Sequence, residues 1–91
     1  MFFRLATIYY GGNILDAIKK LRALTYLIET PNVVGGAIFR TLGGTVALNS
    51  NTPDRKSRAE MSFTVSKSKE DSDRKNEIHQ ILISCGFDVP E

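Results

Sequence analysis

The sequence predicts an α+β domain of two layers, in which two helices cover one face of an antiparallel-rich sheet. In residues 61–65 apolar and polar side chains alternate with a period of two, which is typical of a half-buried strand. From Ile78 onward, apolar side chains recur at helical spacing at Ile81, Leu82 and Cys85, which indicates an amphipathic helix. A strand that runs into such a helix requires the two elements to cover one core.

The composition limits both the size and the class of the protein. The chain of 91 residues is expected to form a single domain over residues 1–91, because a second domain would be too small to bury its own core. The net charge of +2, from 12 basic and 10 acidic residues, is far below that of a dedicated nucleic-acid-binding protein. One cysteine cannot form an internal disulfide, and no apolar run is long enough to cross a bilayer. We therefore expect a cytoplasmic protein without a membrane partner.

The N-terminal third predicts a strand followed by a helix. Residues 2–10 are rich in aromatic and β-branched side chains on both faces, which favours a central strand. A pair of glycines ends this strand, and Asn13 can cap a helix that begins at Ile14. Pro31 disfavours helical geometry at the residue before it, so the helix is expected to end at Thr30.

Two interpretations remain open for residues 37–48, which are strand-like but interrupted by Gly43 and Gly44. The two glycines can form a hairpin turn that pairs Phe39 with Leu48. Alternatively, they can bend one long strand that turns only in the polar segment that follows it. The bent strand is slightly favoured, because that polar segment carries a strong loop signal of its own.

The C-terminal third predicts a strand over residues 60–66 and then the second helix. Residues 68–71 form a capping-box pattern at the start of this helix. Gly86 occupies the usual position just after its end. Residues 87–89 form either a short last strand or a packed tail.

The resulting element order is strand, helix, strand, strand, helix, with an optional last strand. This is the ferredoxin-like βαββα(β) order, in which a right-handed crossover places both helices on the same face of the sheet. The similarity concerns architecture alone, because such a plan hosts many unrelated functions. With the hairpin interpretation, the chain from Asn13 onward also has the helix, three strands and helix of double-stranded-RNA-binding domains. Acidic residues dominate the start of the second helix, however, where that plan requires lysines.

No set of residues in the sequence predicts catalysis. His79 is the only histidine and has no second ligand or carboxylate partner that the sequence reveals, so we expect it in surface or boundary packing. Cys85 belongs to the apolar stripe of the second helix, where a thiol is unreactive. We therefore expect a protein that is not an enzyme and uses neither a metal nor a cofactor.

Apolar side chains beyond the needs of one small core predict a protein-binding surface. The candidate partner-binding residues are Tyr26, Leu27, Ile38, Arg40 and Leu42. A short chain gains burial by association, so we expect a homodimer or higher oligomer, with another protein as a further partner. The function predicted from the sequence is that of a small adaptor, inhibitor or assembly subunit.

Two alternative functions remain, and both require an anion-binding site. Nucleic acid is the less favoured partner, because the basic loop contains no aromatic residue to stack on a base. The cations of that alternative are Arg55, Lys56, Arg58 and Lys67. Gly11 and Gly12 join a strand to a helix and could hold a small anionic ligand or nucleotide, but the rest of a phosphate-binding motif is missing.

Overall fold

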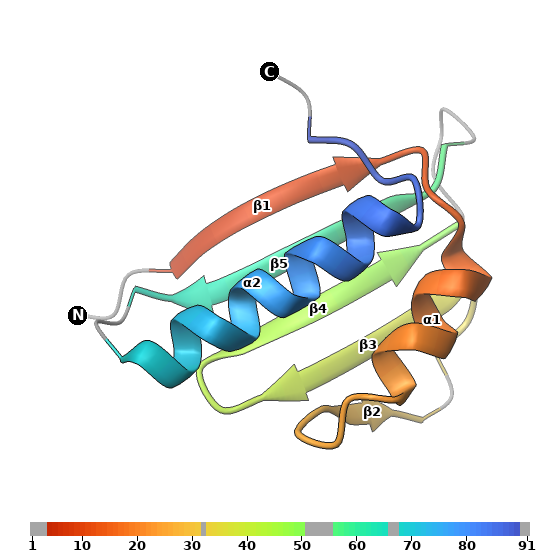
Figure 1. Cartoon of the computed structure of the whole chain (residues 1–91). Helices are drawn as coiled ribbons and strands as arrows, with labels where there is room; N and C mark the ends of the chain where they lie inside the picture. The colour runs from red at the N-terminus through yellow and green to blue at the C-terminus, as the bar shows by residue number, and fades with distance from the viewer. Residues whose placement is uncertain (1–3, 32, 51–55, 66–67, 90–91) are drawn as a thin grey trace.

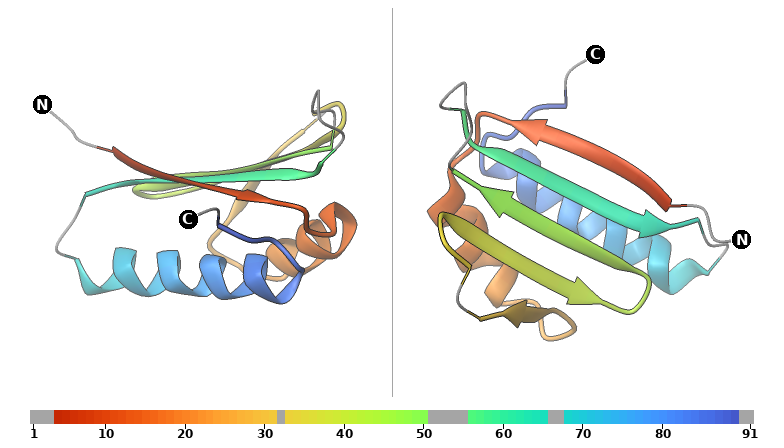
Figure 2. Two further views of the ribbon diagram at one scale, coloured as in Figure 1. Left: turned by 90° about the horizontal axis from the view of Figure 1, so that it is seen from above. Right: turned by 180° about the vertical axis from the view of Figure 1, so that it is seen from behind.

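The computed structural model describes residues 4–31, 33–50, 56–65 and 68–89. In chain order its elements are β1 (Arg4–Tyr10), α1 (Ile14–Arg22), β2 (Ile28–Thr30), β3 (Gly36–Thr41), β4 (Gly44–Asn49), β5 (Arg58–Thr64) and α2 (Lys69–Ser84). The strands form one sheet in the order β1-β5-β4-β3-β2, and all neighbouring strands are antiparallel (Figure 1). Figure 2 shows both helices on one face of this sheet. The predicted α+β class is therefore confirmed.

The ferredoxin-like order is not confirmed, because the sheet contains no parallel crossover. Strand β1 pairs antiparallel with β5, with Arg4 opposite Thr64, and it lies at the opposite edge from β2. The prediction that residues 2–10 form a central strand is also wrong. Strands β2 to β5 instead form a meander, because strands joined by short connections pair most readily with their neighbours in sequence.

Helix α1 begins as predicted but is much shorter than expected. The side chain of Asn13 accepts a hydrogen bond from the backbone N–H of Asp16 at 3.0 Å, which caps the helix before Ile14. The helix ends at Arg22, not at Thr30, and β2 follows within the predicted helical range. Two of the three residues in β2 are β-branched, and pairing with β3 outweighs the helical spacing of the sequence.

Strands β3 and β4 form a hairpin, so the favoured interpretation of one bent strand is wrong. The turn consists of Leu42 and Gly43, one position earlier than the predicted pair of glycines. Phe39 consequently faces Val46 and not Leu48. Gly43 has φ of +90°, a left-handed conformation that favours glycine, which explains where the chain turns.

Helix α2 is confirmed with both of its predicted ends. The side chain of Ser68 accepts from the backbone N–H of Asp71 at 3.4 Å, and Gly86 follows the helix with φ of +91°. The optional last strand is reduced to one bridge between Asp88 and Tyr10. Neither α1 nor α2 is long and apolar enough to cross a membrane.

The core lies between the sheet and the helices and receives side chains from every element except β2. The predicted alternation in β5 and the apolar stripe of α2 both lie in it. Gly44 is also buried, and it packs so closely against the Phe63 ring that an added Cβ would lie 2.6 Å from that ring. The buried side chains are Tyr9, Ala17, Leu21, Ala37, Phe39, Val46, Leu48, Ala59, Met61, Phe63, Ile78, Leu82, Cys85 and Phe87.

Candidate functional site

The β3–β4 turn, the edge strand β2 and the residue Tyr26 surround one hollow of about 300 Å³. Leu42 is 82% exposed and Ile28 is 62% exposed, and both side chains line this hollow. Large aliphatic side chains gathered in solvent are typical of a surface that contacts another protein. We call the surface formed by Tyr26, Ile28, Arg40 and Leu42 the hairpin surface.

The structure brings together three of the five predicted partner-binding residues. Tyr26, Arg40 and Leu42 line the same hollow. Leu27 is partly buried against the core. Ile38 lies two residues before Arg40 in β3 and therefore on the same face of the sheet, but it does not line the hollow. The sequence pattern does not indicate Ile28 as a member of this surface, because the spacing of apolar residues around it predicts a helix. The β-branched residues of β2 were the signal that could have identified it.

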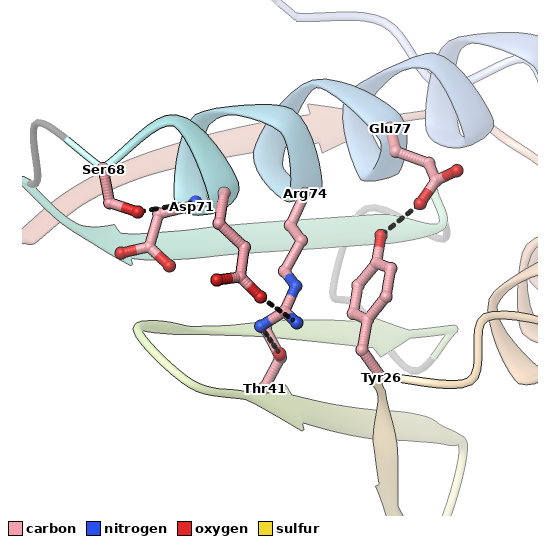
Figure 3. Close-up of polar contacts among 7 residues, drawn as sticks. Tyr26, Thr41, Ser68, Asp71, Arg74 and Glu77 are labelled. Carbon is pink, nitrogen blue, oxygen red and sulfur yellow. Dashed lines mark hydrogen bonds and ion pairs between the residues drawn. The ribbon is translucent and has the colours of Figure 1, made fainter.

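Side chains of α2 hold the hairpin surface in place (Figure 3). The Tyr26 hydroxyl donates to Glu77 Oε1 at 2.5 Å, and the Arg74 guanidinium lies over the Tyr26 ring, 4.7 Å from its centroid. Arg74 also forms an ion pair with Glu70 at 2.6 Å and donates to Thr41 Oγ1 at 3.3 Å. One arginine thus connects the helix to both sides of the hollow, which orders the surface before any partner binds.

Several ionisable groups near the hairpin surface are paired with one another: Tyr26 with Glu77, and Arg74 with Glu70. Burial, and then the hydrogen bond to Glu77, raise the pKa of the Tyr26 hydroxyl, and the charge of Arg74 opposes this rise. A phenol that keeps its proton in this way is a poor acid catalyst near neutral pH. In β2, hydrogen bonds from Arg22 of α1 at 2.7 and 2.9 Å lower the pKa of Glu29. These contacts position side chains and activate none of them.

The turn at Gly11 and Gly12 is filled by groups of the protein itself. The Gly11 N–H donates to the backbone carbonyl of Ser57 at 2.9 Å, and the Ser57 hydroxyl donates to the carbonyl of Gly12. A Cβ at Gly12 would lie 2.1 Å from the Phe87 ring. The turn therefore packs the C-terminal segment against the start of α1, and the Gly11 donor is not free to hold an anion.

The described part of the chain does not gather the predicted cations into one cluster. Arg55 and Lys67 lie outside the described residues. Lys56 is exposed, and Arg58 begins β5, where its guanidinium lies 3.4 Å from the carboxylate of Glu60. The acidic Glu60 reduces the attraction of Arg58 for phosphate.

His79 has a specific partner that the sequence did not reveal. Its Nδ1 lies 2.8 Å from the hydroxyl oxygen of Tyr9, and the two ring centroids are 5.7 Å apart. Tyr9 is fully buried, and burial raises the pKa of its hydroxyl. His79 thus satisfies a polar atom at the edge of the core, which is a structural role.

Metal binding receives no support from the described residues, among which no group of three or more His, Cys, Asp or Glu side chains could hold an ion. No model of a protein family, curated protein or solved structure matches the chain significantly.

Proposed function

We propose that this protein is a non-enzymatic binding module that contacts another protein through the hairpin surface. The observation that carries the proposal is the exposure of Leu42 and Ile28 around one ordered hollow. Contiguous apolar side chains favour removal from water, and a partner that covers both would supply this burial.

The surroundings of the hollow support a protein partner. The exposed Arg40 lies on the same surface, and arginine is enriched in protein interfaces. Glu29 of β2 faces the buried Phe39, so its ion pair with Arg22 lies on the helix side. Arg40 is the polar group that borders the apolar side chains. An apolar centre with a polar rim is the usual anatomy of a protein–protein interface.

Nucleic-acid binding is the weaker alternative. Four strands, β2 to β5, lie between α1 and α2, one more than in the helix, three strands and helix of double-stranded-RNA-binding domains. The first turn of α2 also carries Glu70 and Asp71, and these carboxylates would repel phosphates.

A binding experiment with matched variants tests the proposal. Tagged wild-type protein is expected to retain a partner from an extract of its own source, while Leu42→Asp and Ile28→Asp lose that partner. Ser84→Asp, at an exposed position on the far end of α2, is the control and is expected to keep it. Nuclease treatment should leave the retained partner unchanged. Equal retention by Leu42→Asp would refute the role of the hairpin surface, and loss after nuclease treatment would favour the nucleic-acid alternative.

A further inference from the structure

The outer edge of β1 carries unpaired backbone groups along most of its length. At its C-terminal end, the N–H and carbonyl of Tyr10 both bond to Asp88 at 2.9 Å, on the side away from β5. Successive residues of a strand direct their backbone groups to alternate sides, so Ile8, Ala6 and Arg4 direct theirs outward as Tyr10 does. On this outer side, no described residue forms a backbone hydrogen bond with any of these three. Figures 1 and 2 show the C-terminal segment beside the end of β1 and no described segment beside the N-terminal part of this strand.

We propose that two copies of the chain pair their β1 strands in antiparallel orientation, around a two-fold axis at Ala6. Ala6 then faces Ala6 of the second copy, and Arg4 faces Ile8 on both sides of the axis. Each facing pair exchanges two backbone hydrogen bonds, so all the outward groups of these three residues are satisfied at once. The two sheets become one continuous sheet.

Neighbouring registers satisfy fewer groups. With the axis at Thr7, Arg4 would face Tyr10, whose backbone groups Asp88 already occupies. With the axis at Leu5, Ile8 would face a residue beyond the described strand. The axis at Ala6 is therefore the register that uses all of the free edge.

A second copy of the chain is the partner that fits the free edge of β1 best. Strand β2, the other edge of the sheet, has only three residues against seven in β1 and cannot match the free row. A β1–β2 contact between copies would also leave further edges open and would build a filament, whereas a β1–β1 contact closes as a dimer. The exposed side chain of Leu5 lies next to these unpaired backbone groups of β1. Leu5 is 56% exposed on the helix side of the sheet and would face Thr7 of the second copy.

This inference rests on the proposed function only in treating the chain as a protein-binding module. The hairpin surface lies at the β2 side of the sheet and the dimer edge at the β1 side, so variants separate the two.

The first test measures mass in solution by light scattering at a concentration on the order of 50 µM, a range in which weak specific dimers are populated. Wild type is expected to have the mass of a dimer. Ala6→Pro removes only an outward N–H and should give a monomer with an unchanged circular dichroism spectrum. Leu42→Asp should remain a dimer even if it loses the partner of the hairpin surface. A monomeric wild type, or a dimeric folded Ala6→Pro, would overturn the inference.

A second pair of variants keeps the inference testable if Ala6→Pro disturbs folding. Ala6→Glu and Ala6→Lys each place like charges opposite one another at the axis, so each alone should be a monomer. Mixing them in equal amounts should restore the dimer. Failure of the mixture to associate, with each variant folded, would overturn the inference.

Cysteine cross-linking tests the register. Residues that face each other in a hydrogen-bonded pair have Cα atoms about 5.5 Å apart, which suits a disulfide. Ala6→Cys should therefore form a covalent dimer on mild oxidation, and wild type, whose Cys85 is buried, should not. Thr7→Cys should cross-link poorly. Faster cross-linking through position 7 would contradict the axis at Ala6.

Discussion

The two edge strands of the sheet, β1 and β2, differ in length and in the contacts beside them. Strand β1 has seven residues, and only its last one is bridged to the C-terminal segment. Strand β2 has three residues, and the bidentate ion pair between Arg22 and Glu29 lies beside it. Short edge strands flanked by charged side chains resist the addition of another strand, whereas long edge strands with unpaired backbone groups permit it. We infer that β1 recognises its partner through the backbone, while the β2 side does so through side chains.

Each edge is tied to α2 by one tyrosine, and the two connections differ in their chemistry. Tyr9 in β1 is fully buried and bonds to His79. Tyr26, just before β2, is only partly buried and contacts the charged residues Glu77 and Arg74. The Tyr9 connection should therefore contribute mainly to stability, and the Tyr26 connection should respond to pH and to salt.

The largest effect is expected from removing the support that both edges share. Leu82 of α2 is fully buried, and Leu82→Asp would place an unpaired carboxylate in the core. We expect a loss of at least about 4 kcal/mol in the free energy of unfolding, enough to unfold a marginally stable domain. Circular dichroism and urea unfolding measure this loss. Ile83→Asp, at the exposed neighbouring position, is the control and should remain folded.

Local signals in the sequence were sufficient for α2 and for the start of α1. Caps and amphipathic periodicity depend on residues within one or two turns, so Asn13, Ser68 and Gly86 could be assigned directly. The end of α1 and the place of β1 depend on which strands pair, and pairing is decided by contacts across the whole chain. Local propensity therefore extended α1 too far and placed β1 in the centre.

The candidate site was predicted in part for the same reason. The sequence indicates Tyr26, Arg40 and Leu42 as surplus apolar or neighbouring residues, and the hairpin brings them together. The contact between Tyr9 and His79 joins residues 70 positions apart. The residues next to each of them in the sequence do not indicate this contact. Sequence patterns thus indicated that a surface exists, and tertiary pairing determined its members.

The next effect concerns the one bridge that covers the end of β1. Gly12→Ala would bring a Cβ to 2.1 Å from the Phe87 ring, so this ring and the C-terminal segment must shift. We expect a loss of about 3 kcal/mol and faster hydrogen exchange at the Tyr10 amide, which bonds to Asp88. Gly11→Ala has open space around the new Cβ and only its positive φ of +84° against it, so about 1 kcal/mol is expected. Equal losses in the two variants would contradict packing as the role of Gly12.

A smaller effect should follow from cutting the connection between β1 and α2. His79→Ala leaves the buried hydroxyl of Tyr9 without this partner, at a cost of about 2 kcal/mol in the free energy of unfolding. Tyr9→Phe removes the hydroxyl itself. If the hydrogen bond carries the effect, the double variant Tyr9→Phe/His79→Ala should cost clearly less than the sum of the single variants in urea unfolding. Additive losses would show that the two side chains act independently.

The smallest effect at neutral pH, and the clearest dependence on pH, is expected at the other connection. Burial and Glu77 raise the pKa of Tyr26 in the folded protein above the value of about 10 that it has in the unfolded chain. As the pH rises past about 10, the unfolded chain therefore loses this proton first, and the free energy of unfolding must fall. The stabilisation is fully present below that pH. Tyr26→Phe should change stability little at pH 7 and should make the decline between about pH 10 and 11 shallower than in wild type, as measured by urea midpoints. An unchanged slope would mean that the hydroxyl of Tyr26 titrates alike in both states.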